Sequence, residues 1–301
     1  MGKGSKFPDK RASKISPTSL VNELLVLLSA QKNRKNIMHK YFRVFVNIWG
    51  EIFTYRLNFA MWRFRVVLQL LTVYFLWSTL LMGRSSIFGY STSQMLTYVL
   101  GTSFISSIVL STRTFQIGEQ INDGSLSNFL IKPISYVTYW FAYDLGDKAM
   151  NIFFSVIELT LILFIFRPPL FLQVNPLFLF LGLLATFLAV LLYFFFGFLL
   201  GLLGFWSNET WGPRFIFFII INFFAGSLFP LDILPKSVFK VLEFLPFPYL
   251  LYFPLKIYLG QLPIFAIIQG LFVSALWVGL LYLSSRFIWL KGLKLYGAEG
   301  R

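Results

Sequence analysis

The sequence has no cysteine and only one histidine, His39. Structural zinc sites, iron–sulfur clusters and multi-histidine catalytic sites need several such ligands, so this composition excludes most metal chemistry and predicts no metal site. Disulfides and thiol nucleophiles are excluded because both need cysteine. His39 lies beside Lys40, and we expect it to be a solvated surface residue without a catalytic role.

Charged residues are also scarce, at 13% of the chain, whereas 57% of the residues are hydrophobic and the mean hydropathy is +0.73. A soluble chain would carry about 25% charged residues and could not keep this much apolar surface out of water. The composition therefore predicts an all-α polytopic membrane protein. The net charge of +14 then reflects lysine and arginine retained on the cytoplasmic side of a membrane, and we expect no nucleic-acid partner.

Long runs without charged residues predict six transmembrane helices, because a span of about 30 Å needs about 20 residues. We expect these helices at about residues 64–83, 92–113, 136–166, 177–204, 213–230 and 262–290. Six spans place both termini on one side. Most lysine and arginine residues fall on the inner side if the N-terminus is cytoplasmic, which predicts a protein of the inner (plasma) membrane with both termini in the cytoplasm.

The N-terminal region divides into two parts. Residues 1–37 are polar and basic and predict a flexible arm, followed by a membrane domain over residues 38–301. Within residues 38–62, apolar residues recur at three- and four-residue spacing, which is typical of an amphipathic helix lying in the inner interface. The alternative is that these residues form the first turns of a long first span.

The segment between the second and third predicted spans carries an acidic, partly apolar motif. Glu119 and Asp123 share one helix face, and Asp123-Gly124 predicts a turn. Ser125 can then cap a second short helix whose apolar stripe includes Leu126 and Phe129, and which ends before Lys132-Pro133. This segment is either a docking element or an ordinary interfacial loop.

The segment after the fifth predicted span is apolar but broken by prolines. Irregular backbone survives at membrane depth only where protein or a water-filled cavity satisfies its polar groups. We therefore expect a re-entrant pair of short helices between helices 5 and 6. Its candidate residues are Gly226, Phe229, Pro230, Asp232, Pro246 and Tyr249.

Four charged residues fall within the third predicted helix: Asp144, Asp147, Lys148 and Glu158. Acidic residues within a membrane are functional-site candidates by default. The spacing of four lets Asp144 pair with Lys148 on one face, as a structural link or as part of a pathway. Glu158 is either a neutral, hydrogen-bonded group at a helix contact or a pathway residue.

Several short motifs occur in the order in which a known family has them: Gly124-Ser125-Leu126, Leu130-Ile131-Lys132-Pro133, Gly226-Ser227-Leu228-Phe229-Pro230, Leu234-Pro235, Leu245-Pro246-Phe247, Pro254 with Gly260, Trp289, Gly292-Leu293, Tyr296 and Gly300. With these motifs the chain resembles the ABC-2 type permease family, in its bacterial branch of uncharacterised export permeases. The resemblance covers about residues 40–301 and implies the six-helix fold of ABC-2 (type V) exporters.

The resemblance implies a transmembrane permease subunit of an ABC exporter that works with two ATPase subunits and a second permease copy or paralogue. The ATPase-coupling role would then fall to Glu119, Ile121, Asp123, Leu126, Phe129 and Lys132, and the outer gate to the proline-broken segment. The sequence contains no phosphate-binding loop, so ATP and Mg would be held by the partner ATPase and this chain would bind no cofactor. The aromatic, apolar composition suits an amphiphilic, lipid-like or drug-like cargo.

Two other functions remain open from the residues alone. An ion-coupled carrier would use Asp144, Asp147 or Glu158 as a proton or cation site. A membrane-embedded transferase would need a cluster of polar catalytic residues at a membrane face, which the lone histidine and scattered acids do not supply.

Overall fold

The computed structural model describes residues 41–44, 46, 49–50 and 56–297. The chain divides into two compact units, Met1–Arg43 and Val44–Arg301. In the first unit the described residues, 41–43, are helical. The predicted basic arm over residues 1–37 and His39 lie outside the described residues, and the second unit is described below.

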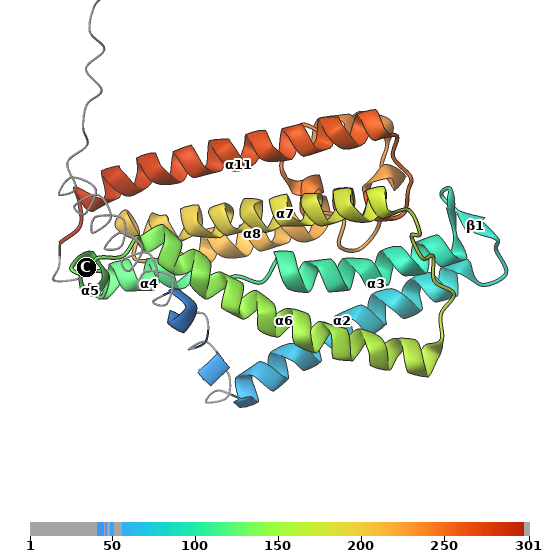
Figure 1. The fold of residues 1–301 in the computed structure, drawn as a ribbon, viewed down its shortest axis with the longest axis horizontal. Coiled ribbons are helices and arrows are strands. Elements are labelled where there is room, and N and C mark those ends of the chain that lie inside the picture. The colour runs from blue at the N-terminus through green and yellow to red at the C-terminus, as the bar shows by residue number, and fades with distance from the viewer. Residues whose placement is uncertain (1–40, 45, 47–48, 51–55, 298–301) are drawn as a thin grey trace, which may run out of the picture. The chain divides into compact units, whose positions relative to one another are not determined.

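The second unit is built from helices, with one small hairpin (Figure 1). Its elements are α2 (Arg56–Leu81), β1 (Ser86–Ile87), β2 (Tyr90–Ser91), α3 (Thr92–Val109), α4 (Gln116–Asn122), α5 (Ser127–Leu130), α6 (Tyr136–Phe166), α7 (Pro176–Leu202), η1 (Leu203–Phe205), α8 (Trp211–Phe224), η2 (Leu231–Ile233), α9 (Lys236–Leu242), η3 (Phe247–Tyr249), α10 (Tyr252–Tyr258) and α11 (Ile264–Leu293). The antiparallel hairpin pairs Ser86 with Ser91 and Ile87 with Tyr90.

Four helices are long and apolar enough to cross a membrane among the described residues: α2, α6, α7 continued through η1, and α11. Helix α8 is apolar but has only 14 residues. Local sequence explains several helix starts. Ser91 and Gln94 form a capping box at α3, Ser135 caps α6, and Asn175 caps α7 with Pro176 in its first turn.

The predicted helix over residues 136–166 is confirmed, whereas other boundaries differ. Helix α2 runs unbroken from Arg56, so the predicted division between an interfacial helix ending at residue 62 and a span starting at residue 64 is wrong. Residues 56–62 are instead the first turns of the long helix. Helix α8 ends at Phe224, six residues earlier than predicted, because Gly226 takes a left-handed conformation (φ 82°) just after the helix.

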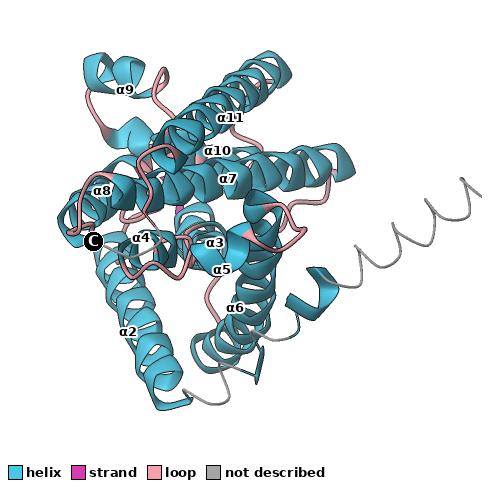
Figure 2. Ribbon diagram, turned by 90° about the vertical axis from the view of Figure 1, so that its left-hand side faces the viewer, coloured by secondary structure: helices cyan, strands magenta, loops and turns pink. Residues whose placement is uncertain are grey.

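Helices α3 and α7 form the centre of this unit. Helix α3 contacts α2, α6, α7 and α10, while α7 contacts α4, α10 and α11. Figure 2 shows the bundle from the end that carries α4 and α5, with α8 above α2 to the left of α3. The segments α4 and α5 lie beside the last turns of α11, and the β1–β2 hairpin lies at the opposite end (Figure 1).

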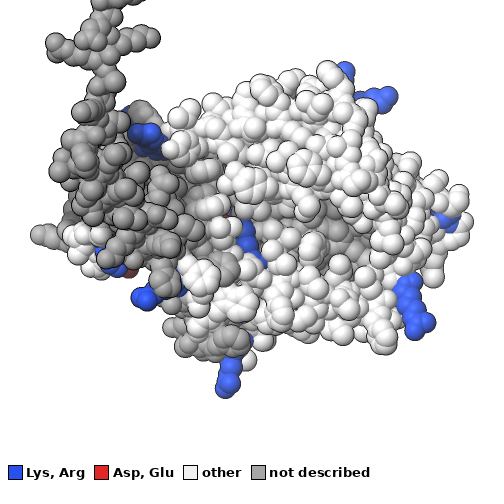
Figure 3. All heavy atoms as spheres, in the orientation of Figure 1, with Lys and Arg blue, Asp and Glu red and all other residues white. Residues whose placement is uncertain are grey.

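Charged side chains on the face seen in Figure 3 gather toward the two ends of the molecule, and a broad uncharged band separates them. A single patch of lysine or arginine atoms interrupts this band at its centre (Figure 3). An uncharged belt between charged ends is the distribution that a hydrocarbon core requires, because charge within it is costly.

Candidate functional site

Helix α4 is fixed against the end of α7 by contacts that only glycine permits. A Cβ on Gly204 would lie 2.8 Å from the carbonyl oxygen of Gly118, and a Cβ on Gly201 would lie 2.7 Å from the carbonyl oxygen of Thr114. Neither backbone oxygen can yield as a flexible side chain could. The backbones of α4 and of the α7–η1 end therefore touch directly.

The turn between α4 and α5 is held by the C-terminal end of α11. The hydroxyl of Tyr296 donates to the carbonyl oxygen of Gly124 (2.6 Å) and accepts from the backbone N–H of Ser127 (3.1 Å). The Asp123-Gly124 turn is confirmed, with Gly124 at φ 78°. Ser125, however, does not cap α5; its own N–H donates to the Asp123 carboxylate (2.9 Å).

The predicted docking residues divide into an exposed group and a buried group. Asp123 and Lys132 are exposed, and the side chain of Glu119 is 71% exposed and 3.8 Å from Arg214. Ile121 and Leu126 are buried in the chain's own core. Leu126, which the sequence places on the apolar stripe of the second short helix, therefore faces the core and fills the space beneath the turn.

Phe129 and its neighbours stand between these two groups. The Phe129 ring packs on Tyr139 at 4.8 Å, and the Lys132 ammonium lies 4.9 Å from the centre of the same ring. Ile131, which follows α5, is 82% exposed. The surface that this segment offers thus includes Glu119, Asp123, Leu130, Ile131 and Lys132.

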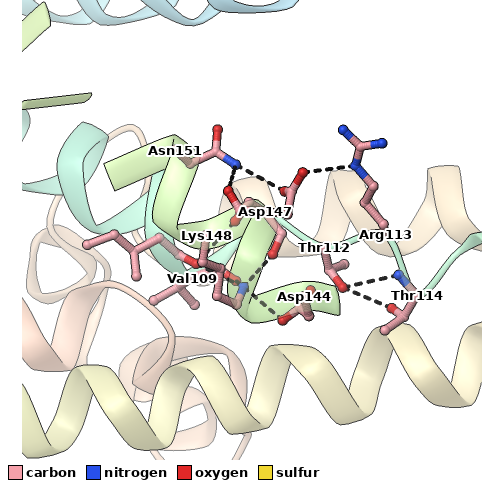
Figure 4. Close-up of polar contacts among 10 residues, drawn as sticks. Val109, Thr112, Arg113, Thr114, Asp144, Asp147, Lys148 and Asn151 are labelled. Atoms are coloured by element: carbon pink, nitrogen blue, oxygen red, sulfur yellow. Dashed lines mark hydrogen bonds and ion pairs between the residues drawn. The ribbon is translucent and has the colours of Figure 1, made fainter. Parts of the chain in front are cut away.

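The predicted pairing of Asp144 with Lys148 is present, and Lys148 also caps a helix. Its Nζ lies 3.3 Å from Asp144 Oδ2 and donates to the carbonyl oxygens of Ile108 (2.9 Å), Val109 (3.3 Å) and Ser111. Helix α3 ends at Val109, so its last carbonyl groups point at a buried ammonium ion (Figure 4). This contact explains how α3 ends four residues before the predicted position.

Asp147 links the same region to the segment that leads into α4. Its Oδ1 accepts from Arg113 Nε (2.8 Å), and its Oδ2 accepts from Asn151 Nδ2 (3.0 Å). Figure 4 shows Arg113 reaching from the non-helical stretch after α3 to Asp147 on α6. The connection between α3 and α4 is therefore tied to α6 by one ion pair.

Glu158 pairs with Arg63 of α2, a residue that the sequence placed in the cytoplasmic flank. Arg63 Nε donates to Glu158 Oε1 at 2.7 Å, and a second guanidinium nitrogen pairs with Oε2. The remaining donors of Arg63 reach Asn151 (3.3 Å) and Ser155 (3.2 Å). Both alternatives that the sequence offered for Glu158 lacked this partner, because the two residues are 95 positions apart.

The proline-broken segment forms short ordered helices, α9 and α10. Gly226 admits the Tyr98 hydroxyl, which donates to its carbonyl oxygen (2.7 Å) and would lie 2.6 Å from a Cβ there. Asp232 accepts from the Tyr90 hydroxyl (2.9 Å) and pairs with Lys256 (2.8 Å). Burial, with the negative charge of Asp232, raises the pKa of Tyr90 well above its usual value, so this hydroxyl stays protonated and donates.

The other predicted residues of this segment pack into the protein. Pro230 and Pro246 are buried, and Phe229 is half-buried against the core around α3. The Tyr249 hydroxyl donates to the carbonyl oxygen of Glu243 (2.6 Å). Burial, with the charge of Glu243, raises the pKa of Tyr249 to about 12, so this donor too is retained at neutral pH.

A cavity of about 700 Å³ opens between α2, α3 and α8. Its wall includes Asp147 and Asn151, so it borders the charged network described above. Serine, threonine, asparagine and glutamine side chains supply much of the remaining wall. A cavity of this size is an ordinary ligand-binding volume. No local sequence pattern predicts it, because its wall comes from separate helices.

Comparison with known families decides the class of this protein. The family model described as "ABC-2 family transporter protein" matches residues 67–300. The chain belongs to the ABC-2 transporter family. A search of curated proteins finds no match. The family consists of membrane transport subunits that generally lack a catalytic site of their own, which agrees with the long apolar helices and identifies an integral membrane protein.

Within this ABC-2 transporter protein, sequence reasoning missed the residues whose roles depend on distant partners. Arg63, Tyr98, Lys256 and Tyr296 each contact an element far away in the chain. Two weak signals existed: Arg63 lies directly before the predicted first span, and Tyr296 belongs to the motifs that carry the resemblance. Among the described residues, no three His, Asp or Glu side chains are grouped to hold a metal ion.

Proposed function

We propose that this chain is the permease subunit of an ABC exporter and that it moves an amphiphilic substrate outward across the plasma membrane. The observation that carries the proposal is the segment α4–α5, which is held rigidly at one end of the bundle and presents acidic and apolar side chains. Membership of the ABC-2 family supports it. Because the sequence has no phosphate-binding loop, ATP and Mg belong to a separate ATPase subunit.

The proposed assembly has two ATPase subunits and two permease subunits, the second permease being a copy or a paralogue. Residues 38–301 form the permease domain in this proposal, and residues 1–37 precede it as a basic arm. Both termini lie in the cytoplasm. This orientation follows from the distribution of lysine and arginine and places α4, α5 and the end of α11 on the ATPase side.

Six spans result if α3 and α8 are counted with the four long helices. Helix α3 has 18 residues and α8 has 14, which correspond to about 27 Å and about 21 Å. Each is followed by non-helical backbone that is satisfied by buried groups, Lys148 after α3 and Tyr98 after α8. Such backbone is tolerated at membrane depth when protein surrounds it. The segment over residues 225–258 is then re-entrant and forms the outer gate.

In the proposed mechanism, closure of the ATPase dimer pushes on α4 and α5. The backbone of α4 contacts that of η1 directly, with no flexible side chain between them. A displacement of α4 therefore displaces α7 as well. The hydrogen bond of Tyr296 couples the same displacement to α11. The ion pair of Arg113 with Asp147 couples it to α6. The helices then tilt and the substrate moves outward.

The coupling role can be tested with Glu119→Lys combined with Ile131→Asp. Both side chains are exposed, so the changes leave the core intact. We expect at least a tenfold loss of ATPase co-purification and of ATP-driven export from proteoliposomes. The matched control is Arg84→Glu, a charge reversal at an exposed position between α2 and β1. Normal co-purification and export in the double variant would contradict the coupling role.

The ion-coupled carrier is less well supported. Each of the carboxylates Asp144, Asp147 and Glu158 already has a cationic partner among the described residues. A proton or metal ion would have to displace that partner.

A further inference from the structure

We propose that the cavity between α2, α3 and α8 binds the head group of the cargo, and that this head group carries a phosphate-like anion beside hydroxyl or amine donors. The inference rests on the proposed function and narrows its substrate class. The cavity holds about 700 Å³ and is lined by residues of α2, α3 and α8 together with the segment that follows α3. Head groups of amphiphiles fit within such a volume.

The α2 wall of the cavity presents an arginine on a polar stripe. Asn58, Trp62, Arg65 and Gln69 line the cavity at spacings of four, three and four residues, which is one face of the helix. An arginine within an apolar helix is costly unless it faces a partner or a water-filled space. Arg65 makes no ion pair with an acidic side chain among the described residues, so the cavity is the environment that accommodates its charge.

Arg63 and Arg65 therefore have different roles although they are two residues apart. Arg63 faces α6, is 5% exposed and is neutralised by Glu158. Arg65 lies on the opposite side of α2 and remains exposed. Arg113 is a second cation on the cavity wall, and Asp147 is the single acidic residue that lines it. The wall thus has a net positive charge, which favours an anion.

Helix α3 contributes hydroxyl groups to the cavity wall, and their protons are already donated to backbone carbonyl oxygens of α3. Thr102 donates to the Tyr98 carbonyl (2.7 Å), Ser106 to Ser103 (2.9 Å) and Ser107 to Phe104 (2.7 Å). Hydroxyls that donate back to their own helix keep only their lone pairs for other contacts. They can accept hydrogen bonds but not donate them, so they select ligand groups that carry protons.

Apolar side chains line the cavity on several elements, among them Phe59, Val66, Leu110, Phe218 and Ile221. One apolar group lies away from the charged residues. Leu70, Val73 and Val99 line the cavity on α2 and α3, on the side toward the β1–β2 hairpin. A ligand that satisfies every part of the wall has an apolar portion at these residues. Its anionic group lies at Arg65, and its hydroxyl or amine donors lie along α3.

The test measures binding to the purified full-length chain, with neither ATP nor ATPase present. Labelled dodecyl phosphate is bound in a scintillation proximity assay and displaced by unlabelled competitors. We expect Arg65→Gln to weaken binding about tenfold, Arg65→Lys to restore part of it, and Arg84→Gln, a change at an exposed arginine in the outer turn, to leave it unchanged. Thermal melting of each variant shows that the protein is folded.

Competitors test the chemical class. Dodecyltrimethylammonium, which has the same tail and the opposite charge, should displace the probe at least tenfold less well than dodecyl phosphate does. Lauroyl lysophosphatidic acid, which adds a free hydroxyl, should bind more tightly, and Ser106→Val should remove that gain. Unchanged affinity in Arg65→Gln, or equal competition by dodecyltrimethylammonium, would overturn the anion assignment. Equal competition by inorganic phosphate would overturn the assignment to an amphiphile.

The two proposals can fail separately. If the chain binds the phosphate amphiphile in an Arg65-dependent way but neither binds an ATPase nor exports with ATP, the proposed function fails and the cavity assignment stands. If ATP-driven export is normal but the affinity for the amphiphile does not depend on the charge of its head group, only the cavity assignment fails.

Discussion

At the scale of single residues, the buried charges of Arg63, Asp147 and Lys148 are neutralised in ion pairs, and their contacts join different elements. Arg63 of α2 pairs with Glu158 of α6, and Arg113, just before α4, pairs with Asp147 of α6. Lys148 pairs within α6 and also holds the end of α3. Such pairs contribute less to net stability than their short distances suggest, because both charges lose their hydration. Removing one partner is costly, since it leaves a buried charge alone.

The pair between Arg63 and Glu158 gives a prediction of this kind. Glu158→Gln should destabilise the folded protein by about 3–5 kcal/mol because it leaves the Arg63 charge buried and unpaired. The double variant Arg63→Leu with Glu158→Leu should recover most of that loss. Thermal unfolding in detergent micelles is measured for Arg63→Leu, for Glu158→Leu and for the double variant. The difference between the double variant and the sum of the two single variants gives the coupling between the residues. If the double variant is less stable than either single variant, the pair is not the cause.

At the scale of elements, α4 behaves as an extension of the α7 end. The close approach depends on Gly201 and Gly204, where a Cβ would meet Thr114 and Ile117 or the backbone of Gly118. A helix of seven residues has little stability alone, so its position is decided by this packing. A displacement of α4 should therefore displace the end of α7 as well.

Gly204→Ala tests this packing. The added methyl group meets backbone atoms of Gly118 at 2.8 and 2.9 Å, so α4 must move away. We expect a loss of about 1–3 kcal/mol in stability and weaker co-purification with the ATPase. The control is Gly212→Ala, where nothing lies within 4 Å of the added Cβ and stability should hold or rise. Equal effects of the two substitutions would show that α4 is not packed as described.

At the scale of the whole transporter subunit, the chain presents two polar ends separated by an apolar belt. The end with α4 and α5 carries Ile131, and the opposite end carries Val174 in the connection between α6 and α7. That connection is tied to the start of α3, where the Phe171 N–H donates to Thr97 Oγ1 (2.8 Å). Residues on the two ends should therefore lie on opposite sides of the membrane.

The absence of cysteine makes this arrangement directly testable. Single cysteines are placed at Ile131 (82% exposed) and Val174 (87% exposed). A membrane-impermeant maleimide added to intact cells should label Val174→Cys, and should label Ile131→Cys only after permeabilisation. The unmodified chain is a label-free background. Labelling of Ile131→Cys in intact cells would reverse the orientation and remove the basis for ATPase coupling.

Sequence patterns predicted the elements whose signal is local. Helix α6 was predicted at both ends, and in the structure Ser135 caps its start. The turn at Gly124 and the bond between Asp144 and Lys148 were predicted because each joins near neighbours in the chain. The start of α2 and the burial of Leu126 were not predicted, because both depend on packing against other parts of the chain.

The sequence alone determined that this protein is helical and lies in a membrane, and it contains no phosphate-binding loop, since hydropathy and motif content are properties of composition and order. Only the tertiary structure decided which charges neutralise one another, which face of α4 is exposed and where a polar cavity opens. The physical reason is distance along the chain: a contact such as that of Arg63 with Glu158 joins residues 95 positions apart, and no local periodicity records it.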